Sequence, residues 1–411
     1  MLLENKIQEK LQLSLFRFID WLNEFGPFSQ DQYDFWATGY GRWAKSVYYQ
    51  NSVVGTFLVS PLVFMDSFVP FTRSFFRKPS RFPIADAHFA MGFAYIYQAT
   101  GESVYYQKMV DQLEALIKSR CPGYKHYAWG YPFQWMTNAG IIEQGTPLIT
   151  STPYVYEAFH TAYQIDRDEK WWAILHSIAA HVAEDYHDLP QNFHSNACSY
   201  IARDKLKNLD FTPVINANTY RAFLLLHAAH LFENAVYKEL GEKNLNFVLD
   251  HQQSDGSWYY AAGKVDQFVD HFHTCFVLKN LAKISHYYKN DRCQQAIDRG
   301  LQFYRSMLFD SQKLPVPFAK KQRLVPYHRE LYDYAECINL GLLLENTEDF
   351  NPDFYDRPLL DLLSNWQKQD GSFRTRKLWV GWNNVPYHRW AQSQLFRSLS
   401  LLVLQKQKIK S

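Results

Sequence analysis

Two pairs of ionisable residues open apolar stretches of the chain, and the members of each pair are three positions apart. Asp270 and His273 form the first pair, and Asp333 and Glu336 form the second. Residues at i and i+3 share one face of a helix, so both members of a pair can act on one ligand. Asp270 and His273 together suit a general base, and two carboxyl groups suit acid and base roles. Asp270 and Asp333 can equally cap their helices, with Glu336 as an exposed charge.

Asp86 opens a third apolar stretch and is a further candidate acid, again with helix capping as the alternative. The predicted catalytic set is therefore Asp86, Asp270, His273, Asp333 and Glu336. Its carboxylates suit glycosidic bond cleavage across a cleft. His273, or Tyr154, suits proton abstraction next to a uronate carboxylate.

Aromatic, hydroxyl and amide residues gather in short strings, and aromatic residues make up 17% of the chain. Flat rings suit the apolar faces of sugars, and neighbouring polar groups fix the orientation of a ligand. Arg389 has a planar fork that suits a carboxylate or a pyrophosphate. Packing is the alternative role for the rings, and capping for the Asn residues. The predicted substrate-binding set is Trp129, Tyr131, Trp135, Thr150, Thr152, Tyr154, Asn216, Asn218, His271, Tyr387 and Arg389.

Asp255 and Asp370 are also acids, but each lies in an Asp-Gly-Ser turn followed by an aromatic residue. Asp in such a turn commonly bonds its own backbone two residues on. We therefore predict that both are turn residues rather than catalytic acids.

Helical hairpins account for most of the chain. Polar residues head apolar segments at Asp86, Tyr154, Asn216, Asp270, Asp333 and His388, which are separated by about 55 to 70 residues, as in arrays of repeated units. Each of the first five is followed by a segment with charge on one face, and residues 4–24 supply a partner for the last, 388–404. This pattern predicts an all-α (α/α)6 toroid formed by one domain, residues 1–411, with helix 4–24 packed on helix 388–404.

Residues 25–84 follow the repeat less well and are expected to be an irregular segment that covers the cleft. Its last part, 71–83, mixes four cations with four aromatic rings. That mixture suits a carboxylate or phosphate ligand or an anionic surface, and equally a solvated segment with buried rings.

Composition excludes several classes of protein. The 43 Lys and Arg against 41 Asp and Glu leave no general basic footprint for nucleic acid. Five scattered Cys residues form no CxxC pair, and there is no HExxH, GxSxG, Walker or Rossmann motif, so we expect no metal and no cofactor. His271 and His273 are two residues apart and diverge on a helix.

Neither a signal peptide nor a transmembrane segment is apparent, which favours a cytoplasmic protein.

Three strings carry a resemblance to a known group: 127–135 (YAWGYPFQW), 145–154 (GTPLITSTPY) and 385–392 (VPYHRWAQ). With the two QxxDGS turns, the chain resembles six-hairpin glycosidase-like proteins encoded beside bacterial polysaccharide biosynthesis genes, from about Trp36 to Leu404. The resemblance implies the toroid and a carbohydrate-related role. A weaker similarity to prenyl cyclase toroids rests on Gln252, Gly256 and Trp258, but no DxDD or DDxxD motif is present.

Three functions remain open from the sequence. The chain is expected to be a glycoside hydrolase-like enzyme of polysaccharide metabolism, acting on an oligo- or polysaccharide that is neutral or acidic. The alternatives are a uronate lyase or C5-epimerase that acts by proton abstraction, and a glycan-binding module without catalysis. No nucleic-acid partner is expected.

Overall fold

The computed structural model describes residues 2–205, 212–263, 267–321, 325–345 and 353–408. Within these ranges, helices dominate and the strands are short. No described helix combines the length and the apolar character that crossing a membrane would require.

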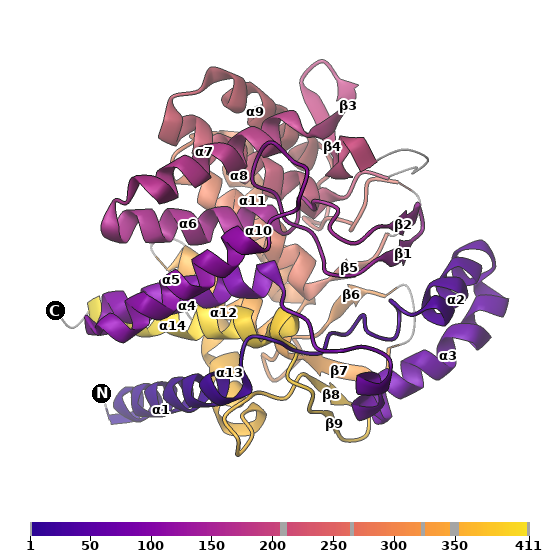
Figure 1. Ribbon diagram of the computed structural model, residues 1–411, viewed down its shortest axis with the longest axis vertical. Coiled ribbons are helices and arrows are strands. Elements are labelled where there is room, and N and C mark those ends of the chain that lie inside the picture. Colours follow the sequence, from indigo (N-terminus) through magenta and orange to yellow (C-terminus); the bar gives the residue numbers. More distant parts are fainter. Residues whose placement is uncertain (1, 206–211, 264–266, 322–324, 346–352, 409–411) are drawn as a thin grey trace.

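Six helices form an inner ring in which each contacts the next and the last contacts the first. They are α4 (Pro83–Thr100), α6 (Thr152–Asp166), α8 (Ile215–Phe232), α10 (His271–Ser285), α12 (Leu331–Leu344) and α14 (Ser393–Lys408). The outer layer consists of α1 (Leu2–Phe25), α5 (Ser103–Lys118), α7 (Glu169–Glu184), α9 (Ala235–Asp250), α11 (Asp291–Met307) and α13 (Asp353–Asp361) with the turn η3 (Leu362–Trp366). This is the predicted (α/α)6 toroid (Figure 1).

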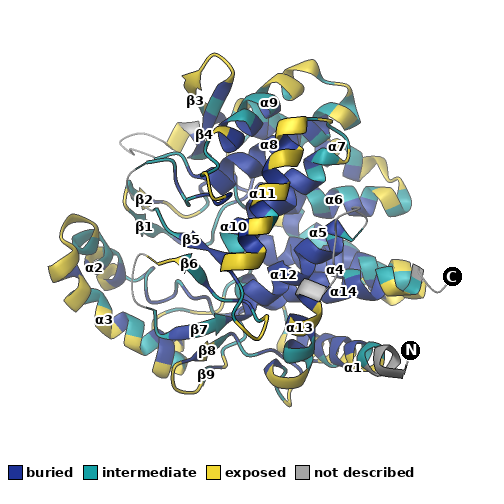
Figure 2. Cartoon of the chain, turned by 180° about the vertical axis from the view of Figure 1, so that it is seen from behind, coloured by how far each residue is buried: buried dark blue, intermediate teal, exposed yellow. Residues whose placement is uncertain are grey.

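The two layers differ in burial because the inner helices have neighbours on all sides. Most residues of α8 and almost every residue of α12 are buried, whereas α11 turns one face to solvent (Figure 2). A helix that is apolar around its whole circumference is stable only with such surroundings. Left-handed residues after the inner helices, such as Gly101 with φ +73°, begin the short turns to the outer layer.

The ring closes where α14 packs between α1 and α4. The rings of Phe18 and Phe396 lie 5.5 Å apart. At Gly92 of α4, a Cβ atom would stand only 2.4 Å from the ring of Phe396, so a larger residue would separate the helices. The predicted packing of the first helix on the last is confirmed.

Short strands gather at the N-terminal ends of the inner helices. The pair β5 (Val269–Asp270) and β6 (Phe318–Lys320) leads into α10, and β7 (Tyr327–Glu330), β8 (Arg376–Leu378) and β9 (Trp382–Asn383) form a sheet that leads into α12. The hairpins β1 (Trp135–Thr137) with β2 (Gly140–Ile142) and β3 (Tyr186–Asn192) with β4 (Ser195–Ala202) are antiparallel. We call the end of the ring that carries β5 to β9 the mouth.

The expectation that residues 25–84 are irregular is wrong. They contain the helices α2 (Gly39–Gln50) and α3 (Ser52–Phe68) and the turn η1 (Pro70–Phe75), which extend from the mouth beyond β1 (Figure 1). We call α2, α3 and η1 the hairpin lobe. Gly55 allows α2 and α3 to pack closely, because a Cβ atom there would lie 2.1 Å from the Cα atom of Tyr48.

The turn role predicted for two Asp residues is confirmed. The carboxylates of Asp255 and Asp370 each accept a backbone N–H bond from the Ser two residues on, at 2.9 Å in both cases. Gly256 and Gly371 between them have φ of +91° and +96°, which only glycine adopts without strain.

Candidate functional site

Asp270 and His273 form a bonded pair at the start of α10. One carboxylate oxygen of Asp270 accepts the backbone N–H of His273 at 2.9 Å and thereby caps the helix. The other oxygen contacts Nδ1 of the His273 ring at 2.7 Å. Capping and orientation, which the sequence left as alternatives, are therefore combined in one side chain. Asp270 is 3% exposed and His273 is 23% exposed, so the imidazole is the accessible member of the pair.

The ring of His273 lies among aromatic rings and beside a small hollow. Tyr260 and Phe272 stand 4.7 and 4.4 Å from it, centroid to centroid. Asn216, at the start of α8, shares this hollow, and its buried Oδ1 has no hydrogen-bond partner among the described residues. Ring faces with a free amide oxygen and an imidazole edge are suited to a hydroxylated ligand.

Asp333 lies behind this pair and is wholly buried. Burial raises the pKa of its carboxyl group well above the usual range, and the nearby charges of Glu330 and Asp270 raise it further. Neither oxygen has a hydrogen-bond partner among the described residues. Asp333 is therefore harder to ionise than an ordinary carboxyl group and is closed to solvent.

Glu336 lies one turn deeper, inside the ring, in an ion pair with Lys279 of α10. Both side chains are buried. Burial lowers the pKa of Lys279 to about 8, although Glu336 acts in the opposite direction. The second predicted carboxylate is thus neutralised by a cation rather than directed at the mouth.

Tyr154 lies in the same interior and is 1% exposed. The side chains of Lys279 and Arg397 stand 5.7 and 5.3 Å from its ring centre, and the ring of His88 stands 4.5 Å away. Burial and the charge of Glu336 raise the pKa of Tyr154 well above its ordinary value, which disfavours it as a base. We call Tyr154, His88, Lys279, Glu336 and Arg397 the lumen cluster.

Sequence reasoning missed three members of the lumen cluster: His88, Lys279 and Arg397. Burial lowers the pKa of His88 far below 6.5, as do Arg397 and Lys279, so His88 is neutral. A signal was available, because Lys279 and Lys283 stand four residues apart in the apolar α10, where a charge needs a buried partner. Lys283 indeed pairs with Glu157 of α6.

Asp86 does not converge on the site. Both of its oxygens accept bonds from Nε of Arg81, whose Nη2 reaches Gln112 of the outer helix α5. Burial raises the pKa of Asp86 to about 7, although Arg81 lowers it. Asp86 therefore lies on the side of α4 that faces the outer helix α5.

Arg389 lies at the mouth but is already paired. Its guanidinium donates to both oxygens of Asp31, at 2.8 and 2.6 Å, and stacks on Tyr131 at 4.4 Å. Trp390 next to it reaches Phe272, 5.9 Å away, so Arg389 and the Asp270–His273 pair share one end of the ring. Binding of a substrate carboxylate would require the pair with Asp31 to open.

Three other predicted binding residues flank the mouth and are partly exposed: Tyr131, Trp135 and Thr150. The rings of Trp135 and Tyr200 lie 6.4 Å apart, and the hydroxyl of Thr150 donates to that of Tyr200 at 3.2 Å. They form an aromatic wall beside Arg389.

The remaining predicted binding residues are buried and serve the framework. Trp129 is 0% exposed and donates to the carbonyl of Leu116 at 2.8 Å, so it does not line the site. The hydroxyl of Thr152 donates to the carbonyl of Leu148 at 3.0 Å. Tyr387 is buried and its hydroxyl is bonded to a guanidinium N–H.

Asn218 and His271 are likewise structural. Asn218 accepts the backbone N–H of Cys198 at 2.7 Å and so fixes β4 to α8. Nε2 of His271 contacts the hydroxyl of Tyr304 on the outer helix α11 at 2.7 Å, and burial lowers the pKa of His271 to about 3. As expected of residues two apart on a helix, His271 and His273 diverge.

Among the described residues, no three His, Cys, Asp or Glu side chains are grouped as metal ligands. No family model matches the sequence, and no curated protein matches it.

Solved structures do match. A GH76 α-mannanase of Bacteroides thetaiotaomicron aligns with TM-score 0.58 and 10% identity over 92% of this chain and 99% of its own. An unsaturated glucuronyl hydrolase specific for heparin aligns with TM-score 0.57 and 13% identity over 81% and 88%. A sugar epimerase from a ruminal bacterium aligns with TM-score 0.57 and 9% identity over 79% and 88%. The chain has their toroid fold.

Proposed function

We propose that this protein is a carbohydrate-active enzyme in which His273, oriented by Asp270, transfers a proton to or from a sugar. The observation that carries the proposal is the 2.7 Å contact that fixes Nδ1 of His273 on a buried carboxylate and leaves the imidazole partly exposed among aromatic rings. A base that is held by a second group and lies beside a hollow has the geometry of a general acid–base catalyst.

Proton abstraction next to a carbonyl or carboxylate group leads to epimerisation, isomerisation or elimination. Nε2 would take the proton from carbon, and the electron pair would move onto the neighbouring oxygen. Lys279 is paired with Glu336, but Arg397 of the lumen cluster adds a further positive charge inside the ring, and such preorganised charge would stabilise a developing oxyanion. The sugar epimerase among the structural neighbours is consistent with this class of reaction.

Glycoside hydrolysis is the second candidate, and one observation favours it. Burial and the nearby charges of Glu330 and Asp270 raise the pKa of Asp333 above its usual range, and a carboxyl group that resists ionisation suits the acid role beside a second carboxyl group. The burial of both groups counts against it, because neither reaches a glycosidic oxygen without rearrangement.

We further propose that the substrate is a bacterial oligo- or polysaccharide and that the reaction takes place in the cytoplasm. The resemblance of the motifs to proteins of polysaccharide loci supports this assignment, as do the glycan-processing neighbours. The partly exposed rings of Tyr131 and Trp135 beside the mouth supply stacking surface.

The test uses neutral and uronate-containing oligosaccharides in deuterated water, with products read by mass spectrometry. Proton transfer at carbon predicts incorporation of deuterium, or a 4,5-unsaturated product, that is lost in His273→Ala. The exposed His194 supplies a matched control, and His194→Ala should retain turnover. Hydrolysis without deuterium on carbon would move the assignment to the second candidate, and binding without turnover would leave a glycan-binding module.

A further inference from the structure

The hairpin lobe presents an unusual amount of apolar surface. Of the twenty-two large apolar side chains that are exposed among the described residues, eleven lie within residues 40–76. Phe75, Phe57 and Phe71 are 82%, 76% and 69% exposed. The others are Tyr40, Trp43, Tyr49, Val53, Val54, Phe64, Phe68 and Phe76. Contiguous apolar patches on this scale mark interaction surfaces.

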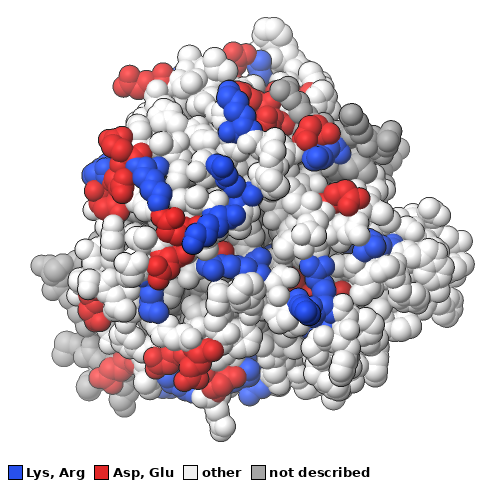
Figure 3. All heavy atoms as spheres, in the orientation of Figure 1, with Lys and Arg blue, Asp and Glu red and all other residues white. Residues whose placement is uncertain are grey.

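Positive charges outnumber negative ones near this surface. Residues 35–85 contain six Lys and Arg residues and one acid, Asp66. Arg77 and Arg81 pair with Asp34 and Asp86, which flank this range. Lys78 is exposed, and Arg77 and Arg81 are partly exposed. Figure 3 shows the lobe at the right, where Figure 1 places α2 and α3, as almost wholly free of Asp and Glu.

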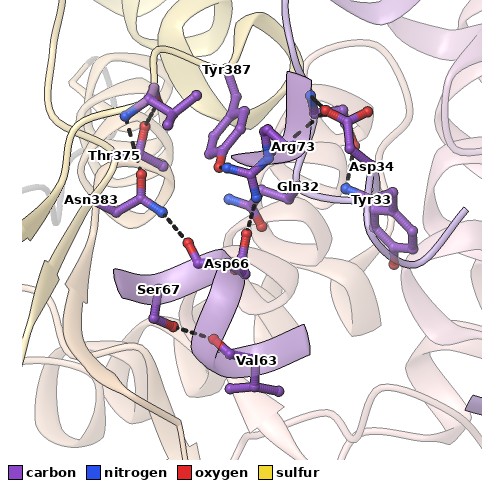
Figure 4. A network of polar contacts seen from close by, with 12 residues as sticks. Gln32, Tyr33, Asp34, Val63, Asp66, Ser67, Arg73, Thr375, Asn383 and Tyr387 are labelled. Carbon is purple, nitrogen blue, oxygen red and sulfur yellow. Dashed lines mark hydrogen bonds and ion pairs between the residues drawn. The ribbon is translucent and has the colours of Figure 1, made fainter. Parts of the chain in front are cut away.

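Buried polar contacts hold the base of the lobe on the ring and remove its one acid from the surface. Asp66 pairs with Arg73 and with Arg376 of β8, and its carbonyl accepts the Asn383 amide at 2.9 Å (Figure 4). Arg73 is 1% exposed and is also bonded to Tyr387. The lobe is therefore fixed at its base, and its outward apolar side faces solvent.

We propose that the hairpin lobe is a binding element for the surface of a bilayer that contains anionic lipids. Phe and Val side chains on α3 and η1 would enter the boundary of the acyl chains, with Trp43 and the Tyr residues of α2 at headgroup level. The exposed Lys78 would meet the lipid phosphates. The exposed Phe and Val side chains offer no hydrogen bonds to a glycan, and two copies meeting face to face would oppose like charges.

Vesicle sedimentation with the full chain tests the proposal. We expect binding to vesicles of phosphatidylcholine with about one third phosphatidylglycerol, weaker binding to phosphatidylcholine alone, and weakening by salt. The double variant Phe57→Ser, Phe75→Ser should lower the partition coefficient about tenfold or more, because both rings are mostly exposed and leave little packing behind.

Phe193, which is 89% exposed at the turn between β3 and β4, and Leu13, which is 62% exposed on α1, supply the control. Phe193→Ser with Leu13→Ser removes comparable apolar surface elsewhere and should leave vesicle binding unchanged. Equal loss in both double variants, or no binding to either vesicle, would overturn the proposal. So would a dimer in sedimentation velocity that Phe57→Ser, Phe75→Ser dissolves, since the lobe would then bind a second copy.

Discussion

The carboxylate of Asp270 contacts His273 twice, once at its backbone N–H and once at Nδ1 of its ring, at 2.9 and 2.7 Å. One side chain therefore fixes both the start of α10 and the direction of the imidazole. This double contact separates the effects of two substitutions, because Asn can still cap a helix but does not hold the imidazole as a carboxylate does.

Asp270→Asn and His273→Ala should each lower turnover by on the order of 100-fold or more, as loss of a general acid or base does. The melting temperature should stay close to that of the wild type in Asp270→Asn, because the cap is kept. Turnover and thermal melting of both purified variants check this. Full turnover in both would remove His273 from the mechanism.

The Lys279–Glu336 pair should behave as a buried ion pair. Lys279→Met leaves an uncompensated carboxylate inside the ring and should lower the free energy of unfolding by about 3–5 kcal/mol. Lys279→Met with Glu336→Gln removes both charges and should recover much of that loss. Urea denaturation of the single and double variants measures the difference, and equal stability of the two would contradict a direct pairing.

The planar guanidinium of Arg389 suits a substrate carboxylate, and on that ground alone Arg389→Lys would weaken binding of acidic substrates. With Asp31 already bound, we expect a loss of stability of about 2 kcal/mol or more, because Lys keeps the charge but not the two parallel bonds. A double-mutant cycle with Asp31→Asn measures the coupling. If kcat/KM falls for acidic sugars alone while stability is unchanged, the fork binds substrate after all.

Asp86 should make stability depend on pH. Its pKa is raised from 3.8 to about 7, mainly by burial and against the effect of Arg81, so the folded state binds this proton more tightly than the unfolded state. That contribution is present below about pH 4 and is lost as the pH rises to about 7. The free energy of unfolding of the wild type should therefore fall relative to Asp86→Asn across this window. Parallel pH profiles of the two proteins would refute the assignment.

Asp255→Ala should cost stability and not activity. It removes the bond that the Ser257 backbone N–H donates, a loss of about 1 kcal/mol. Thermal melting and an activity assay separate the two effects, and a drop in turnover at constant melting temperature would assign Asp255 to catalysis.

Sequence patterns predicted the fold because burial repeats with the helical period. The inner helices α8 and α12 are buried along most of their length, and the Asp-Gly turns can be recognised from their local residues. Such features depend on residues that are close in sequence, so they can be recognised from a single amino-acid sequence.

The partners of buried charges were not predictable in the same way. Asp31 lies 358 residues before Arg389, and no local pattern joins them. Trp129 stands in a string typical of a sugar site, yet its indole N–H is turned to Leu116 of the outer layer. The sequence thus located the mouth of the ring but not which of its polar residues were already occupied.

The position of α14 between α1 and α4 bears on the order in which the protein can be built. The helix α14, which completes the ring, is the last of the ring helices to be synthesised. On the ribosome, about 300 residues are therefore added after α4 before α14 can pack on it. Until then the Phe89 and Phe93 faces of α4 and the Phe18 face of α1 lack their partner Phe396. Interrupted synthesis or loss of residues 393–408 would leave an open ring with aromatic edges, and chaperone capture of such chains is the expected fate.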